Sequence, residues 1–115
     1  MYYILLVIYY FPIMDEKTKA KVIEVKKLIA SKEYDKALEV CDYITIMLTS
    51  KQPAVYLFAG FCQEKLKKDA EAEKSYKFAE DLDPNNIDCC KALYGLYTRL
   101  KKPDQAAIYL KRLCQ

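Results

Sequence analysis

An internal repeat constrains this sequence more than any other feature. Three segments align in one frame, and their matching triplets are Ala37/Cys41/Ile44, Ala72/Tyr76/Ala79 and Ala106/Leu110/Leu113. The second and third triplets lie 34 positions apart, whereas the first and second lie 35 apart, so we expect one extra residue in the connection Thr49–Gln52. A fixed period of roughly 20–50 residues is the signature of stacked, repeated units. The chain is therefore expected to fold as three similar units in series.

Each unit has the pattern of two antiparallel helices. Within each triplet the residues recur at i, i+4 and i+7, which is the spacing of one helical face. Pro53 and Pro103 suit the first turn of a helix, and Asp83–Asn86 is expected to end one helix while Asn86 caps the next. We expect tight turns inside the hairpins at Tyr34-Asp35 and at Lys67–Asp69. The low count of two Gly and four Pro also favours helices over many short strands.

Small residues recur where the two helices of a unit must come close together. Gly60 allows the partner helix to approach, and alanines have the same role on the second helices, at Ala37, Ala72 and Ala106. Tyr56 and Tyr76 are then expected to fill the space between one helical pair and the next.

The middle unit carries a characteristic series of residues, namely Tyr56, Ala59-Gly60, Gln63, Ala72, Tyr76, Ala79 and Pro84. The next unit repeats part of the series at Leu93, Tyr97, Ala106, Leu110 and Leu113. The series resembles the pattern of the tetratricopeptide repeat (TPR) family, W-x2-L-G-x2-Y…A-x3-F…P. Over about residues 18–115, the resemblance implies an all-α fold, a right-handed α-solenoid of about three TPR helix-turn-helix repeats. The expected units are an atypical first TPR over residues 14–52, a TPR over 53–86 and an incomplete TPR over 87–115.

The sequence departs from the family pattern in each unit. Gln63 replaces an aromatic residue, and Tyr94 stands where a small residue is expected. Lys21 and Glu24 are expected to break the opening helix of the first unit, which would make that unit an N-terminal cap or a degenerate repeat. The third unit stops at Cys114-Gln115 before any polar capping helix, whereas a solenoid needs its last apolar face covered. We therefore expect a fragment, a truncated gene product or half of an assembly.

The first thirteen residues, MYYILLVIYYFPI, contain no charged residue, and a normally charged sequence begins only at Met14. The segment is shorter than the ~20 apolar residues that cross a bilayer as a helix. It also lacks the basic start and the cleavage pattern of a signal peptide. Four explanations stay open: an extension of the gene model upstream of a start at Met14, a membrane anchor, a poor signal, and an apolar segment packed on the fold. We favour the extension, which would leave residues 1–13 outside the fold.

The composition argues against catalysis and against several kinds of ligand. A net charge of +3 is too small to indicate a nucleic acid or an acidic membrane as the partner. The chain contains no His, the commonest general base and a frequent metal ligand, and it has no Gly-rich phosphate loop. The acidic residues of one helix are expected on a solvated outward face, at Glu71, Glu73, Glu80, Asp81 and Asp83. We therefore expect no enzyme activity, no cofactor and no metal site.

The five cysteines are Cys41, Cys62, Cys89, Cys90 and Cys114. Their number is odd and no two of them form a C-x-x-C pair, so neither a disulfide framework nor a zinc site is indicated. Cysteines on the apolar side of helical patterns are usually small buried hydrophobes. This use of cysteine indicates a reducing compartment, and we expect a cytoplasmic protein.

The family resemblance also implies a concave groove, lined by the first helix of each unit, that binds an extended segment or a helix of a partner protein. The groove residues assigned by the family pattern are Val22, Lys26, Ile29, Leu57, Phe61, Glu64, Lys65, Asp88, Lys91, Thr98 and Arg99. Phe61 is expected to be the aromatic anchor, with packing against the neighbouring unit as the alternative role. The alternative for the charged groove residues is that they only form a solvated helix face; these residues are Glu64, Lys65, Lys91 and Arg99.

One kind of TPR ligand is disfavoured. Repeat proteins that bind the acidic C-termini of chaperones use a clamp of Lys, Asn and Arg at fixed groove positions. Those positions here hold Val22, Lys26, Phe58, Asp88 and Ala92. Only Lys26 is basic, and Asp88 would repel a carboxylate.

A narrower resemblance concerns the stretch Lys32–Cys41, KEYDKALEVC, which is similar to the opening repeat of the large TPR scaffold subunits of superkiller (Ski) complexes. Ala92–Tyr97 and Lys102–Ala106 are also similar to short motifs of that family. The resemblance implies a scaffold for helicase and propeller subunits that assists exosome-mediated decay of cytoplasmic mRNA. The alternative is a membrane-anchored TPR adaptor or receptor that uses residues 1–13. We do not expect direct nucleic-acid binding, because Lys and Arg alternate with acidic residues.

Overall fold

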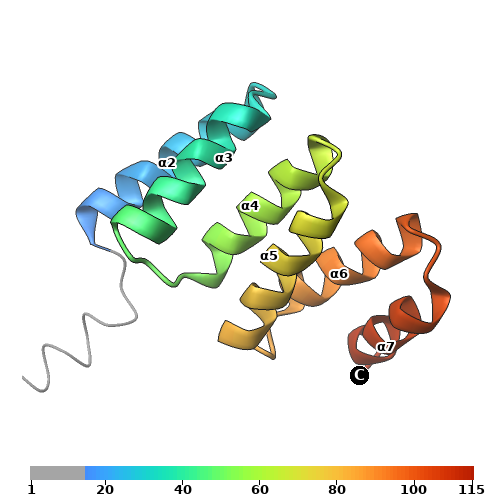
Figure 1. Cartoon of the computed structure of the whole chain (residues 1–115). Helices are drawn as coiled ribbons and strands as arrows, with labels where there is room; N and C mark the ends of the chain where they lie inside the picture. Colours follow the sequence, from blue (N-terminus) through green and yellow to red (C-terminus); the bar gives the residue numbers. More distant parts are fainter. Residues whose placement is uncertain (1–14) are drawn as a thin grey trace, which may run out of the picture.

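The computed structural model describes residues 15–115, and the regular structure in that range is entirely helical. The elements are α2 (Glu16–Ala30), α3 (Tyr34–Asp42), a π-helical turn η1 (Tyr43–Met47), α4 (Pro53–Lys65), α5 (Asp69–Leu82), α6 (Ile87–Arg99) and α7 (Pro103–Leu113). Consecutive helices pair as α2–α3, α4–α5 and α6–α7, and the three pairs follow one another in space (Figure 1). The predicted all-α class is confirmed, whereas the expectations for residues 1–13 lie outside the described residues.

Residues identified in the sequence begin three of these helices. Pro53 and Pro103 are the first residues of α4 and α7, where a missing N–H leaves no intrahelical bond unmade. The Oδ1 atom of Asn86 accepts a hydrogen bond from the N–H of Cys89 at 3.0 Å and so caps α6. The predicted extra residue is also confirmed, because the connection 48–52 is one residue longer than the connection 83–86.

Each helical pair turns through a lysine in the left-handed backbone conformation. Lys32, Lys67 and Lys101 have φ angles of 63°, 65° and 57°. The N–H of each lysine donates to a carbonyl in the last turn of the preceding helix, at 3.0 to 3.1 Å, in the manner of a helix C-cap. The predicted turn at Lys67–Asp69 is confirmed except for Asp69, which already begins α5. The turn predicted at Tyr34-Asp35 is wrong, because Tyr34 begins α3 and the chain reverses just before it.

Helix α2 is continuous, so the prediction that Lys21 and Glu24 break it is wrong. Asp15 caps its start, accepting a hydrogen bond from the N–H of Thr18 at 2.7 Å. The ammonium of Lys21 donates to the Glu24 carboxylate at 3.2 Å, and both side chains are at least partly exposed. Charged residues of this kind are good helix formers. They are tolerated here because Glu24 is exposed and the ammonium of Lys21 lies over the ring of Tyr43, 5.3 Å from its centre.

The buried residues form two clusters that divide between α4 and α5. The first cluster joins α2, α3, η1 and α4 through Val22, Val25, Ala37, Cys41, Ile44, Val55, Ala59 and Cys62. The second joins α5, α6 and α7 through Ala72, Tyr76, Ala79, Cys89, Leu93, Leu96, Tyr97, Ala106 and Tyr109. In both clusters the first helix of a unit packs on the second helix of the unit before it.

Gly60 and Tyr76 connect the two clusters. A Cβ atom at Gly60 would lie 2.3 Å from Cε1 of Tyr76, so the tyrosine ring occupies the place of the missing side chain. Tyr76 is 2% exposed and belongs to the second cluster. Tyr56 of α4 packs against the same cluster and lies 4.5 Å from the ring of Phe78, between ring centroids. The predicted roles of Gly60 and Tyr76 are confirmed, whereas the ring contact of Tyr56 lies within its own helical pair.

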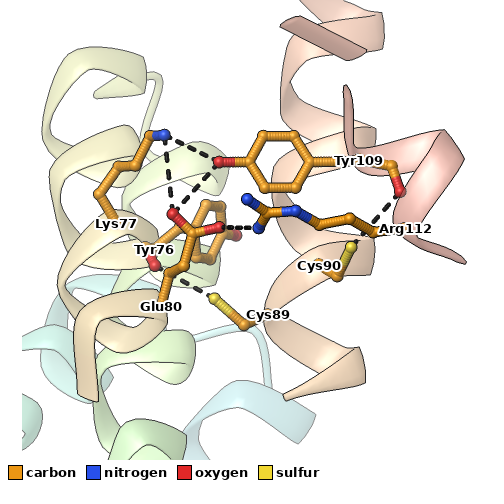
Figure 2. A network of polar contacts seen from close by, with 7 residues as sticks. All are labelled: Tyr76, Lys77, Glu80, Cys89, Cys90, Tyr109 and Arg112. Atoms are coloured by element: carbon orange, nitrogen blue, oxygen red, sulfur yellow. Dashed lines mark hydrogen bonds and ion pairs between the residues drawn. The ribbon is translucent and has the colours of Figure 1, made fainter. Parts of the chain in front are cut away.

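A polar network joins α5 to α7 (Figure 2). The hydroxyl of Tyr109 accepts a hydrogen bond from Lys77 at 2.8 Å and donates to the carboxylate of Glu80 at 3.3 Å. Arg112 donates to the same carboxylate at 2.8 Å, and its guanidinium lies 5.1 Å from the centre of the Tyr109 ring. Glu80 is therefore not on a simply solvated outward face, as the sequence suggested, because α7 returns alongside α5.

Candidate partner-binding groove

An apolar cavity of about 440 Å³ lies among α2, α4 and α6. Its lining residues are Ile29, Ala54, Leu57, Phe58, Phe61, Tyr76, Asp88 and Ala92. Helix α4 supplies half of them, because positions three and four apart share one helical face. Asp88 is the one charged residue among the described residues that line this cavity. The cavity has the size and the polarity to accept an apolar side chain of a ligand.

A second cavity, of about 540 Å³, adjoins the first and shares Phe61, Tyr76 and Ala92 with it. Its further lining residues are Glu64, Lys65, Lys67, Lys91, Gly95, Leu96 and Arg99. The two cavities together form a continuous surface between α4 and α6, with α2 at one end. We call this surface the groove.

Some charged residues of the groove form ion pairs and others do not. Arg99 forms ion pairs with Glu64 at 3.0 Å and with Asp69 at 2.6 Å, and these hydrogen bonds raise the pKa of Arg99 above its usual range. The hydroxyl of Tyr76 donates a further hydrogen bond to the Glu64 carboxylate. Lys65 and Lys91 form no ion pair with any residue in the part of the chain that the structure describes. The second cavity therefore presents uncompensated positive charge.

Phe61 lies at the junction of the two cavities. Its side chain is 37% exposed, and its ring meets the ring of Tyr34 edge-on with 6.0 Å between centroids. The ammonium of Lys65 lies 5.4 Å from the centre of the Phe61 ring. Phe61 thus packs against the preceding unit while part of its side chain stays exposed, so both predicted roles are compatible with its position.

The structure brings most of the predicted groove residues together. The residues that line the two cavities are Ile29, Leu57, Phe61, Glu64, Lys65, Asp88, Lys91 and Arg99. Three others lie elsewhere. Val22 is 6% exposed and belongs to the first buried cluster, and Lys26 is exposed but lines neither cavity. Thr98 lines a different cavity, formed by α6 and α7, and its hydroxyl donates to the carbonyl of Tyr94 at 2.8 Å.

Several groove residues were missed in the sequence, including Ala54, Tyr76 and Lys67. Ala54 could have been found, because it lies three positions before Leu57 on the same helical face. Tyr76 lies on the second helix of its unit and reaches the groove only because Gly60 has no side chain. Lys67 is placed by the left-handed turn after α4, which the sequence does not mark with a glycine.

The cysteines show no sign of a reactive site. All five are free thiols, and Cys41, Cys62 and Cys89 are buried. Burial raises the pKa of the Cys41 thiol to about 12 and the pKa values of Cys62 and Cys89 to about 11. The prediction of small buried hydrophobes is confirmed for these three but is wrong for Cys114, which is exposed. In residues 15–115 no three His, Cys, Asp or Glu side chains are grouped to hold a metal ion.

No protein-family model matches this sequence, and no curated protein matches it. Two solved structures of MamA mutants are similar to this chain, and MamA is a TPR-containing protein. The first has a TM-score of 0.73 and 19% identity, over 86% of this chain and 72% of the MamA chain. The second has a TM-score of 0.72 and 19% identity, over 85% of this chain and 53% of the other.

The fold is a TPR-type solenoid. This confirms the fold class that the repeat and the family resemblance predicted. At 19% identity the likeness concerns the fold alone. None of the helices in residues 15–115 is both long and apolar enough to span a bilayer.

Proposed function

We propose that this chain is a non-catalytic binding module that holds a segment of a partner protein in the groove. The observation that carries the proposal is the pair of adjoining cavities on α4 and α6, one apolar and one basic. A TPR-type solenoid uses its concave surface in this way, because stacked units expose a continuous row of side chains from their first helices.

The two cavities define the chemistry of the partner segment. An apolar or aromatic side chain fits between Phe61 and Leu57, where it would be removed from water. An acidic side chain a few residues away would lie near Lys65 and Lys91. Asp88 disfavours an acidic residue at the apolar end, which gives the segment a direction in the groove.

The test compares the proteins that two variants of the full chain retain from a native lysate. Phe61→Glu places a charge in the groove and should weaken binding by about 2 kcal/mol or more, as for other interface anchors. Phe78→Glu is the matched control, because Phe78 is 44% exposed but lines neither cavity. Partners that depend on Phe61 and not on Phe78, by quantitative mass spectrometry, would support the proposal. Equal retention by both variants would contradict it.

A narrower form of the proposal assigns the chain to a superkiller-type scaffold in the cytoplasm that assists mRNA decay. The sequence similarity of Lys32–Cys41 supports this assignment. The stretch forms part of the turn between α2 and α3 and most of α3. Recovery of helicase and propeller subunits in the Phe61-dependent set is the expected result. Their absence from that set, in a lysate that contains them, would count against this assignment and leave the groove proposal standing.

The alternative function, a membrane-anchored adaptor or receptor, depends on residues 1–13, which lie outside the described residues. Their uncharged sequence is its support. Membrane association that resists carbonate extraction would favour the anchored form, and full release by carbonate would contradict it.

A further inference from the structure

The three hairpin turns hold the same residue at the same position, in a backbone conformation that does not favour it. Lys32, Lys67 and Lys101 directly follow the last turns of α2, α4 and α6, and each has a positive φ angle. We call these three residues the turn lysines. Glycine adopts this conformation without strain, and helices commonly end on one. Strained backbone of this kind is typical of functional sites, so the repeated lysine needs an explanation outside the turn geometry.

The helix dipole does not explain the turn lysines. A cation near the C-terminus of a helix is favourable, but the last turns of α2, α4 and α6 already contain Lys27, Lys65 and Arg99. The side chains of the turn lysines form no ion pair and no hydrogen bond with any residue of the range 15–115. All three residues are exposed. Their charges are therefore available to a ligand.

The three turns lie along one edge of the molecule (Figure 1). The two helices of each pair run in opposite directions and the pairs follow one another, so the connections between pairs lie along the opposite edge. Lys32 and Lys67 stay exposed although a further helical pair packs against each of their pairs. Stacking of the units therefore leaves the turns open to solvent. We call the surface formed by residues 31–33, 66–68 and 100–102 the basic edge.

The other charged residues of the basic edge add to its positive charge. Lys68 and Lys102 directly follow two of the turn lysines, and both are exposed. The equivalent residue of the first turn is Glu33, whose carboxylate forms an ion pair with Lys36 at 3.1 Å. The basic edge therefore presents five lysines against one acidic residue that is already paired.

An acidic protein segment fits the basic edge better than a bilayer or a nucleic acid does. The large apolar side chains that are exposed in residues 15–115 all lie outside the three turns, so none of them could insert there into a bilayer. The turns also contain no aromatic ring on which a base could stack. Asp69 and Asp104 begin the helices that follow two of the turns and would repel a continuous phosphate backbone. A protein segment can place its carboxylates at the lysines alone.

We propose that the basic edge binds an acidic segment of a partner protein, which crosses the three turns and pairs its carboxylates with the turn lysines. This site goes beyond the groove, because its contacts are charges at the turns and not the apolar cavity beside Phe61. Lys67 is the one turn lysine that also lines a cavity of the groove, so the test separates the two surfaces.

The test measures the affinity of the full chain for a fluorescent deca-glutamate peptide by anisotropy, at about 0.1 M salt, where distant charges are screened. In the turn variant, Lys32→Gly/Lys67→Gly/Lys101→Gly, we expect binding to be about fivefold weaker or more, because three exposed charge pairs are lost. Glycine suits a positive φ angle, so this variant should fold at least as well as the wild type.

The matched control removes three exposed lysines from the opposite edge, in the variant Lys17→Gln/Lys51→Gln/Lys111→Gln. These residues lie in the first turn of α2, in the connection 48–52 and in the last turn of α7. Both triple variants lower the net charge from +3 to zero, so a general effect of charge is the same in both. The control should bind the peptide within about twofold of the wild type, since its charges lie far from the basic edge.

Three results with the peptide would overturn the proposal: no binding by the wild type, equal affinities of the turn and control variants, and a comparable loss in Phe61→Ala. Phe61→Ala removes the expected anchor of the groove without a change in charge, so that loss would place the acidic segment in the groove and leave the groove proposal standing.

Two further probes are titrated in the same way, vesicles with about 30% phosphatidylserine and a decathymidine strand. Weaker binding of both than of the peptide is the expected result. Tighter binding of either probe, lost in the turn variant, would make a membrane or a nucleic acid the occupant of the basic edge and overturn the proposal.

Discussion

At the scale of single residues, the two glycines have opposite surroundings. A Cβ atom at Gly60 would collide with the Tyr76 ring, whereas a Cβ atom at Gly95 would meet nothing within 4 Å. Gly60→Ala should therefore destabilise the fold by about 1–3 kcal/mol, as overpacking does in well-filled cores. Gly95→Ala is the control and should stabilise α6 by about 0.5–1 kcal/mol, because alanine is the better helix former. Urea unfolding of both variants tests this, and a neutral Gly60→Ala would contradict it.

The thiols give a second residue-scale prediction. In the native protein Cys114 should react first with a thiol reagent, because it is exposed at the end of α7. Cys41, Cys62 and Cys89 should react only on unfolding, since their burial both blocks access and raises their pKa values. Mass spectrometry after timed alkylation measures this order. Early labelling of Cys41 in the folded protein would contradict the packing of the first cluster.

At the scale of the elements, the lysine with a positive φ angle at each hairpin turn lowers the stability of the fold. Replacing Lys67 by glycine should stabilise the protein by about 1 kcal/mol, because glycine adopts a positive φ without strain. Lys68→Gly is the matched control, since Lys68 has a φ of −104° and gains nothing from the change. A melting temperature that rises for Lys68→Gly and not for Lys67→Gly would contradict the turn geometry.

The ion pairs of Arg99 connect three elements and make stability depend on pH. The hydrogen bond from Arg99 lowers the pKa of Asp69, so the folded state favours the carboxylate more than the unfolded state does. This contribution is present above the usual value of 3.8 and is lost as the pH falls through the lower, folded-state pKa. Asp69→Asn should therefore lower the melting temperature at neutral pH, with a difference that shrinks in acid. Asp104→Asn, in the first turn of α7, is the control for the effect of the helix dipole. A difference in melting temperature between Asp69→Asn and the wild type that does not change with pH would contradict the role of Arg99.

The helical elements could be predicted from the sequence, whereas the turns and some side-chain contacts could not. The triplets fixed the three helical pairs and the longer connection 48–52, because burial of one face repeats at the helical period. The lysine turns and the Tyr109–Glu80 network escaped prediction, since they depend on how the chain reverses and on which helix lies alongside α5. Within the groove, the exposed charges of α4 and α6 could be placed from the family pattern. Tyr76 could not, because its access depends on the absence of a side chain at Gly60.

At the scale of the whole molecule, the three helical pairs follow one another in space (Figure 1). The groove is lined by residues of all three pairs, mainly from α4 and α6. The two buried clusters meet mainly through the α4–α5 pair, where Tyr76 fills the space beside Gly60. The groove is built on this junction, since Tyr76 and Phe61 line both of its cavities. The position of the binding surface is therefore tied to the packing between units.

The most direct test of this account is photocrosslinking in cells with p-azidophenylalanine at position 61 or at position 78 of the full chain. Both positions hold a phenylalanine that is about equally exposed, so the substitution changes little besides reactivity. A covalent adduct with a partner from position 61 and none from position 78 is the result that the groove predicts. An adduct from position 78 alone would place the binding surface outside the groove and contradict the account.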